Sequence, residues 1–174
     1  SAAYTFALAL SATRGRSRRL EAARLAGYAT CGFVLVSTLL LTYAFVSHDF
    51  RITYVARYSD RDQPWPYLLS ALWGGQDGSL LWWLLLLCVY VSACIAWLKG
   101  RYRQLQPVII ATLMAVIAFF AILMLFAANP FATGFGAAPG DGEGLNLLLE
   151  NWYMAIHPPS LYIGFVGCTV PFAF

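Results

Sequence analysis

One of the two histidines in the sequence lies in a setting suited to chemistry. His157 comes directly before Pro158 and Pro159, and a proline restricts the backbone of the residue before it to extended conformations. We therefore expect an extended approach to the prolines and a helix that begins behind them, with His157 held at the mouth of that helix. A neutral imidazole in this position can ligate a metal, including haem iron, or carry a proton. The alternative is a solvated side chain at a helix end.

A glycine-rich segment is the second candidate: Trp73-Gly74-Gly75-Gln76-Asp77-Gly78-Ser79. Glycines before a helix allow backbone N–H groups to approach a ligand, and the N-terminus of a helix favours an anionic one. Ser79 and Asp77 are residue types that cap the start of a helix. A tight turn without a ligand is the alternative, and it requires the same glycines.

Tryptophans gather around the same segment. Trp65 and Trp73 precede the apolar stretch, and Trp82 and Trp83 lie near its start. Aromatic faces stack on planar ligands, and such a pair adds about 0.5–1.5 kcal/mol beyond the burial of area. A belt of tryptophans that anchors a protein at a membrane surface has the same composition, so the spacing is compatible with both. The other histidine, His48, has neither prolines nor a glycine motif beside it.

The composition indicates which elements must carry these residues. Of the 174 residues 60% are apolar and 11% are charged, and the mean hydropathy is +0.67. Soluble domains carry about 25% charged residues, so a cytosolic enzyme, a nucleic-acid-binding protein and a disordered chain are excluded. The cysteines lie in apolar stretches and form no C-x-x-C pair, which indicates neither a thiol oxidoreductase nor a covalent haem acceptor. They are Cys31, Cys88, Cys94 and Cys168.

Three apolar blocks, 25–46, 78–98 and 107–128, reach the length of about 20 residues that a helix needs to cross a ~30 Å hydrocarbon layer. Backbone groups in lipid are satisfied only within helices or closed barrels, and no alternating pattern indicates a barrel. Partial apolar blocks lie at both ends, so we expect a piece of a larger protein, cut inside a helix at each end. The prediction is an all-α integral membrane protein, a polytopic transmembrane helix bundle with two long extracytoplasmic loops.

The predicted segments follow in order along the chain. They are a partial helix (1–13), a basic cytoplasmic loop (14–24), a second helix (25–46), an outer loop with the glycine-rich motif (47–77), a third helix (78–98), a cytoplasmic loop (99–106), a fourth helix (107–128), an outer loop ending at the prolines (129–157) and the start of a fifth helix (158–174).

Charge predicts the orientation of these segments. Loop 14–24 carries five arginines against one glutamate, and loop 99–106 carries three basic residues and no acid. Residues 48–72 balance three arginines against three aspartates, and loop 129–157 carries acids alone. By the positive-inside rule both short basic loops are cytoplasmic and both long loops lie outside, together with His157.

Several motifs together resemble a known family. The segment His157-Pro-Pro-Ser-Leu-Tyr-Ile-Gly-Phe-Val-Gly167, followed by Val170-Pro-Phe-Ala-Phe174, closely resembles a signature of CcmF-type cytochrome c haem lyases, which are related to nitrite-reductase haem lyases. Further motifs resemble this family in its own order: Asp49-Phe50 with Tyr54-Val55-Ala56, Trp73-Gly-Gly-Gln-Asp-Gly-Ser-Leu-Leu-Trp82, and Asn129-Pro130-Phe131. The resemblance covers nearly the whole chain, as the N-terminal part of the family.

The resemblance implies a haem lyase of the bacterial inner membrane. Such a protein attaches haem to the thiols of a C-x-x-C-H motif in apocytochrome c on the periplasmic side, during cytochrome c maturation. Its partners would be a membrane-anchored haem chaperone, apocytochrome c with its thiol-presenting partner subunit, and the lipid bilayer, without nucleic acid. The family's HPP histidine, assigned as an axial haem ligand, corresponds to His157. Trp73, Trp82 and Tyr162 are then candidate haem contacts.

The resemblance also places the rest of the family's haem machinery further along than this chain. The second external ligand, a tryptophan-rich WWD segment and two intramembrane histidines that hold a resident haem b are expected there. Family members often have His-Glu where this chain has Gln76-Asp77, so the acid is kept and the role of the first position does not carry over. We expect haem b as the substrate at the external site, no catalytic group beyond the haem ligand, and no activity from this part alone.

Two other functions compete with a haem lyase. A transporter or a membrane subunit of a respiratory complex would place ionisable groups near the middle of its spans, and the three complete apolar blocks contain none. A purely structural membrane anchor would tolerate replacement of the tryptophans and of His157.

Overall fold

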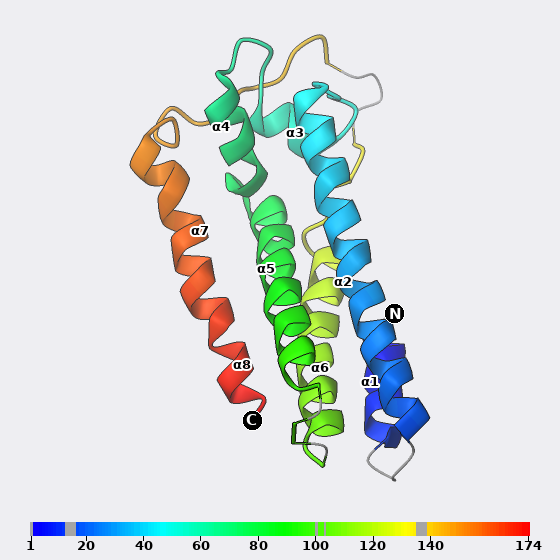
Figure 1. Cartoon of the computed structure of the whole chain (residues 1–174). Helices are drawn as coiled ribbons and strands as arrows, with labels where there is room; N and C mark the ends of the chain where they lie inside the picture. The colour runs from blue at the N-terminus through cyan, green and yellow to red at the C-terminus, as the bar shows by residue number, and fades with distance from the viewer. Residues whose placement is uncertain (1, 13–16, 100, 103, 135–138) are drawn as a thin grey trace. The chain divides into compact units, whose positions relative to one another are not determined.

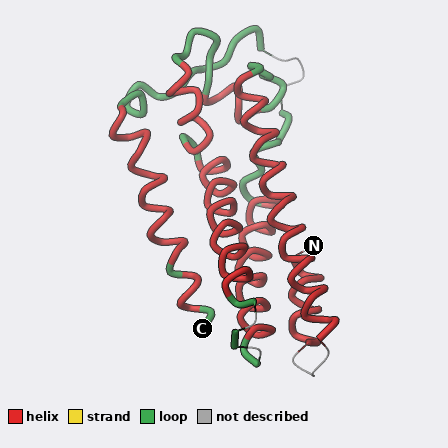
Figure 2. Tube along the Cα trace, viewed as in Figure 1, coloured by secondary structure: helices red, strands yellow, loops and turns green. Residues whose placement is uncertain are grey.

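The computed structural model describes residues 2–12, 17–99, 101–102, 104–134 and 139–174, and every regular element in these ranges is a helix (Figure 1, Figure 2). The elements are α1 (Ala2–Ala12), α2 (Ser17–Val46), α3 (Thr53–Tyr58), α4 (Trp65–Ser70), the 3-10 helix η1 (Ala71–Trp73), α5 (Gln76–Trp97), α6 (Gln106–Phe126), α7 (Trp152–Gly167) and α8 (Thr169–Phe172). The predicted all-α class is confirmed.

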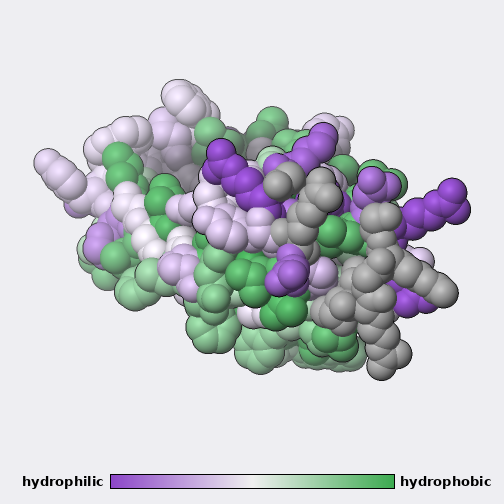
Figure 3. Space-filling model, turned by 60° about the horizontal axis from the view of Figure 1, so that its bottom comes forward, coloured by the Kyte–Doolittle hydropathy of each residue, from purple (hydrophilic) through white to green (hydrophobic). Residues whose placement is uncertain are grey.

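Three helices are long and apolar enough to cross a membrane. They are Arg18–Val46 in α2, Gln76–Trp97 in α5 and Gln106–Phe126 in α6. Large apolar side chains on these helices point outward: Phe33 is 67% exposed and Phe119 is 61% exposed. Figure 3 shows hydrophobic residues along the lower edge and in the middle of the face, together with several strongly hydrophilic ones. Exposed apolar surface of this extent suits lipid, which confirms the prediction of a polytopic membrane protein.

The helix α2 begins at Ser17, eight residues before the expected span of 25–46. Its additional first turns are built from arginine, leucine, glutamate and alanine, all of which favour the helix. Hydropathy locates where a segment enters lipid, whereas helix formation continues as long as the backbone is satisfied. The ends of α5 and α6 lie within two residues of the expected ones. Differences of this size are ordinary at helix ends, because the last turns fray.

The helix α7 differs more from its expected start at residue 158. It begins at Trp152, so Pro158 and Pro159 stand inside the helix and His157 lies in its second turn. Asn151 explains this early start, because its Oδ1 accepts the backbone N–H of Tyr153 at 3.0 Å. This is an N-cap, in which a side-chain oxygen satisfies one of the unpaired N–H groups at the first turn.

The chain forms two compact units, and α2, α5, α6 and α7 contribute residues to both. Unit 1 comprises residues 1–35, 84–122 and 163–174. Its buried core includes Leu87 and Ile95 of α5 with Leu113 of α6. Unit 1 therefore contains the parts of the helices that adjoin the two basic loops of the sequence.

A buried glutamine links the end of α5 to α2 in unit 1 through hydrogen bonds. The side-chain amide of Gln106 donates to the carbonyls of Leu98 and Arg101, which follow the last turn of α5. The Gln106 Oε1 accepts a hydrogen bond of 2.5 Å from Arg24 of α2. Helix ends leave carbonyls without partners, so Gln106 supplies what the end of α5 lacks. Arg24 thus has a structural partner as well as a place in the basic loop.

Unit 2 comprises residues 36–83 and 123–162, which include both long loops. The six-residue helix α3 is too short to persist alone, and the second loop holds it at both ends. The Thr53 N–H donates to the carbonyl of Ala132 at 2.9 Å. At the other end, the Glu143 N–H donates to Ala56 at 2.7 Å and the Gly144 N–H to Ser59 at 3.3 Å. Loop segments far apart in sequence therefore stabilise each other.

Charges separate between the units as the orientation argument expects. Among the described residues, unit 1 has Glu21 as its one acid beside five basic residues, whereas unit 2 has the other seven acids. Arg14, Arg16 and Arg103, which the orientation argument also used, lie outside the described residues. The orientation itself stays a prediction, and the labelling of exposed loop positions tests it.

We expect a cysteine at Asp62 to react with an impermeant thiol reagent in intact cells, and a cysteine at Gln104 to react only after permeabilisation. Both side chains are exposed, whereas Ser59, in the same loop as Asp62, is fully buried and would be a poor reporter. The measurement is mass-tagging in a Cys168→Ser background, because Cys168 is an exposed thiol. The reverse labelling pattern would overturn the predicted orientation.

Candidate functional site

A buried tyrosine ties the short helix α3 to the glycine-rich turn. Tyr54 of α3 is 3% exposed, and its Oη donates to the carbonyl of Ala71 at 3.1 Å and accepts the N–H of Gly75 at 3.0 Å. Burial raises the pKa of Tyr54, so its hydroxyl stays protonated and remains a donor. The ring of Phe45 meets the Tyr54 ring edge-on at 5.7 Å. Tyr54 therefore fixes the backbone that precedes α5.

The glycines of this turn are needed by the protein's own side chains. A Cβ at Gly75 would overlap the ring of Tyr58, and a Cβ at Gly78 would overlap the carbonyl of Leu72 and the hydroxyl of Tyr54. The space that the sequence left open for an anionic ligand is thus filled by two tyrosines. The structure supports the tight turn, since close packing of backbone against a ring requires glycine.

The expected caps of α5 are also different. The helix begins at Gln76, and the Ser79 Oγ donates to the carbonyl of Trp73 at 2.8 Å instead of accepting an N–H group. Asp77 lies in the first turn, where a carboxylate is favoured by the helix dipole. Ser79 therefore closes the turn that carries Trp73.

Two predicted site residues, Trp73 and Trp82, lie in contact. Their ring centroids are 5.0 Å apart and the planes are tilted by 44°. The Trp82 Nε1 is buried and has no hydrogen-bond partner. The other two tryptophans behave differently: Trp83 packs on Tyr162 with centroids 5.4 Å apart, and Trp65 is 73% exposed. The aromatic cluster predicted from sequence is therefore divided into two pairs and one exposed ring.

The indole of Trp73 also reaches the helix that carries His157. Its Nε1 donates to the carbonyl of Ala155 in α7 at 2.9 Å. In a regular helix this carbonyl would accept the N–H of the residue four positions later, which is Pro159 and has none. The proline thus frees an acceptor and Trp73 satisfies it. The glycine-rich motif and the HPP motif are joined by this bond.

His157 lies on an exposed face of α7. It lines an open hollow of about 530 Å³ together with five neighbours on the same helix, most of them apolar or aromatic. These are Trp152, Tyr153, Met154, Ile156 and Ser160. Tyr153 is 82% exposed and Trp152 is 60% exposed, so apolar rings surround an accessible imidazole. This arrangement suits a flat apolar ligand with an atom that the imidazole can bind.

The structure does not bring all predicted site residues to one cavity. Trp73 and Tyr162 line a different hollow of about 110 Å³, together with Pro158. His157 and Tyr162 are five residues apart, which places them about 140° apart around the helix axis. Pro158 and Tyr162, four residues apart, share the inward face. The helical period predicts that His157 and Tyr162 lie on different faces only if both belong to the helix. The expected helix start at residue 158 left His157 outside the helix, so the sequence analysis did not separate them.

His48 takes a structural place at the end of α2. Its φ is 50°, and the N–H of Asp49 donates to the carbonyl of Ala44 at 2.9 Å, which closes the helix. Asp49 then pairs with Arg51 at 2.7 Å, and the hydrogen bonds from Arg51 lower the pKa of the Asp49 carboxyl. Histidine tolerates this left-handed conformation better than most residues do. The neighbouring motif therefore terminates a helix.

A polar hollow of about 310 Å³ lies in unit 2 at the start of α5. Gln76 and Asp77 line it, together with Arg57 of α3 and Asn129, neither of which the sequence singled out as a site residue. No spacing rule connects these four positions, because the two long loops bring them together. Within the described residues, no group of three His, Cys, Asp or Glu side chains could hold a bare metal ion.

The sequence and the fold were compared with those of known proteins. The chain matches no family model. It is 38% identical over 169 residues, 95% of its length, to cytochrome c-type biogenesis protein CcmF of Pseudomonas fluorescens, and 42% identical over 148 residues to CycK of Rhizobium meliloti. A solved structure named cytochrome c heme lyase CcmF superposes with a TM-score of 0.82 at 30% identity, covering 99% of this chain and 27% of that one. The chain spans about a quarter of the length of these curated relatives.

Replacement of Gly78 by alanine should destabilise the protein by at least about 1–3 kcal/mol, because the new Cβ overlaps backbone as well as a tyrosine. Gly32→Ala in α2 is the matched control, since nothing lies within 4 Å of its Cβ position and alanine favours the helix. The free energy of unfolding in detergent measures both. Equal stability of the two variants would contradict the packing described here.

Trp73→Phe and Trp82→Phe should differ although they remove the same atoms. Trp73→Phe leaves the Ala155 carbonyl without a partner, whereas Trp82→Phe removes an N–H group that has no hydrogen-bond partner. The first substitution should therefore lower the free energy of unfolding by about 1–3 kcal/mol more than the second. Chemical unfolding of both variants in detergent provides the comparison. A larger loss for Trp82→Phe would refute the role given to the indole N–H of Trp73.

Proposed function

Because the chain is a homologue of the N-terminal part of CcmF-type cytochrome c biogenesis proteins, we propose that it is the haem-handling part of a cytochrome c haem lyase. Its substrate would be haem b, and the product a haem attached to the C-x-x-C-H thiols of apocytochrome c. The observation that carries this proposal is the accessible imidazole of His157 within an apolar, aromatic hollow. A solvated cap needs no such surroundings.

His157 is the proposed axial ligand of the haem iron. Its side chain is exposed on α7 and lies beside Trp152, Tyr153 and Met154, whose apolar surfaces suit the faces of a porphyrin. Iron in haem commonly takes one protein histidine, so a single imidazole is sufficient on this side. Haem supplies the vinyl groups that react, and His157 holds them where the two thiols of the acceptor can meet them. Ligation at this place acts by proximity more than by proton transfer.

Trp73 is a positioning residue in this proposal. Its hydrogen bond to Ala155 holds the turn of α7 that comes directly before His157, from the opposite face of the helix. The prolines that follow contribute rigidity and leave the acceptor free. Trp82 packs on Trp73 and thereby supports the same contact. Trp73, Trp82 and Tyr162 would then orient the helix, while the residues beside His157 contact the porphyrin.

The remaining parts of the function concern the whole protein. We place it in the bacterial inner membrane with the His157 face toward the periplasm, in agreement with the sorting of charge between the units. A membrane-anchored haem chaperone would deliver the haem, and apocytochrome c with its thiol-presenting partner subunit would receive it. A resident haem b in the longer protein would keep the iron reduced. This chain supplies the first external ligand.

His157→Ala in the full-length protein should reduce the yield of mature cytochrome c to below about a tenth, since even indirect partners of metal ligands contribute about 10- to 100-fold. Haem staining of the acceptor measures the yield, and added imidazole should restore part of it. His48→Asn is the control, because asparagine also tolerates the left-handed conformation at that position and His48 has no place in the proposed site.

The same pair of variants separates ligation from folding. The His157→Ala protein should insert into the membrane normally, but after purification it should lack the visible absorption band of externally bound haem. The His48→Asn protein should insert normally and keep this band. Normal maturation by the His157→Ala protein would remove the assignment of His157 and the proposal with it.

A further inference from the structure

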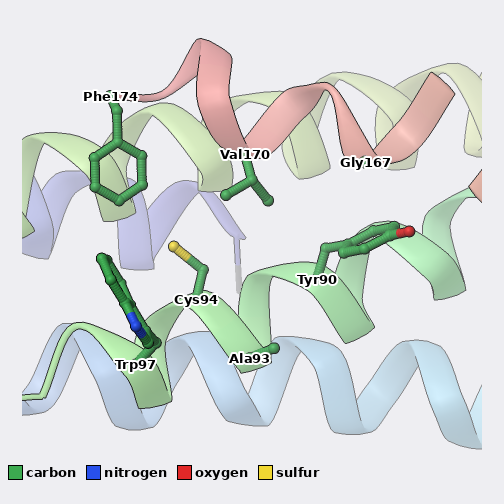
Figure 4. A pocket seen from close by; sticks show the side chains of 7 residues that line it. All are labelled: Tyr90, Ala93, Cys94, Trp97, Gly167, Val170 and Phe174. Carbon is green, nitrogen blue, oxygen red and sulfur yellow. The ribbon is translucent and has the colours of Figure 1, made fainter. Parts of the chain in front are cut away.

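An apolar groove lies between α5 and the C-terminal helices within unit 1 (Figure 4). Its volume is about 480 Å³, and its lining is hydrocarbon, aromatic or sulfur-bearing: Tyr90, Ala93, Cys94, Trp97, Gly167, Val170 and Phe174. Figure 4 shows Phe174 and Val170 pointing across the groove toward Trp97 and Cys94. The Tyr90 hydroxyl is already committed, because it donates to the carbonyl of Ile163 at 2.9 Å. The groove therefore suits an apolar occupant.

Small side chains and a broken helix create this groove. Ala93 of α5 and Gly167 of α7 both line it and leave space that larger residues would fill. The helix is interrupted between Gly167 and Thr169, because Pro171 has no N–H to donate to the Gly167 carbonyl. The interruption turns the last residues of the chain so that Phe174 meets Trp97, with ring centroids 6.1 Å apart.

One end of the groove carries positive charge. The guanidinium carbon of Arg101 lies 5.2 Å from the centroid of the Trp97 ring, in a cation–π contact. Lys99, two residues earlier, is exposed as well. Tryptophan favours the boundary between hydrocarbon and water, so Trp97 marks where the apolar groove meets the headgroup region. The one acid among the described residues of unit 1, Glu21, belongs to α2.

We propose that the groove binds one acyl chain of an anionic phospholipid, whose phosphate pairs with Arg101. The groove lies on a membrane-spanning helix, where acyl chains are the available apolar molecules. A lipid places its phosphate at the depth of Trp97 when its chain lies along α5. Arginine forms two parallel hydrogen bonds to a phosphate, and basic residues at the membrane surface select anionic headgroups over neutral ones. Charge complementarity thus identifies the headgroup, and the apolar lining identifies the chain.

The binding of phosphatidylglycerol and phosphatidylcholine with identical acyl chains tests the headgroup. The chain purified in mild detergent should retain phosphatidylglycerol at least about fivefold better in native mass spectrometry, as expected for one basic side chain at the surface. Arg101→Gln should reduce phosphatidylglycerol to the level of phosphatidylcholine. Arg18→Gln is the matched control, since Arg18 is an exposed arginine of α2 and does not line the groove.

A second pair of variants tests the acyl-chain site. Ala93→Leu fills the groove and should remove the retained lipid, whereas Ala96→Leu, the same change at an exposed position of α5 outside the lining, should leave it. Leucine favours the helix at both positions, and size-exclusion chromatography checks that each variant stays folded. Equal retention of the two phospholipids, or full retention by Ala93→Leu, would overturn the proposal. Should Ala93→Leu aggregate, the Arg101→Gln comparison decides alone.

Discussion

The hydrogen bond from the Trp73 indole to the Ala155 carbonyl is the interaction on which unit 2 depends. It exists because Pro159 removes the donor that a helix would otherwise provide. A buried carbonyl without a partner costs free energy, and an indole from a distant loop removes that cost. The proline therefore makes α7 require a partner, and the glycine-rich turn supplies it. Two motifs more than 70 residues apart have one physical reason to occur together.

The same logic extends through the two long loops. Tyr54 holds the turn that carries Trp73, and the second loop holds both ends of the helix that carries Tyr54. Each short element is unstable alone and is satisfied by a neighbour that is equally dependent. Hydrogen bonds to backbone groups therefore link the two long loops of unit 2 into one network. Such a network is the kind of rigid base that the proposed ligand site, built from only a few side chains, would require.

The residues of the HPP motif, His157-Pro158-Pro159, lie on two different faces of α7. Pro158 and the Ala155 carbonyl face the rest of unit 2, whereas His157 and the aromatic residues around it face outward. The role proposed for His157, ligation of an incoming substrate, requires a side chain that is accessible and also held in place. The helix meets both needs because adjacent residues point to different sides of it. The predicted haem contacts Trp73 and Tyr162 belong to the holding face.

Hydropathy and composition alone determined the fold class, the three spans and the concentration of unusual residues in two long loops. These follow from a single sequence because the requirement for about 20 apolar residues in lipid is local.

The start of α7 and the separation of His157 from Trp73 were decided by tertiary structure. Asn151 caps the early start of the helix, and the Ala155 carbonyl, which Pro159 leaves without a donor, receives its partner from another loop. Likewise, the glycines admitted either a ligand or a side chain, and the positions of Tyr54 and Tyr58 decided between them. Long-range contacts satisfy the backbone where local sequence leaves it unsatisfied, which is why the loops could not be derived from their own residues.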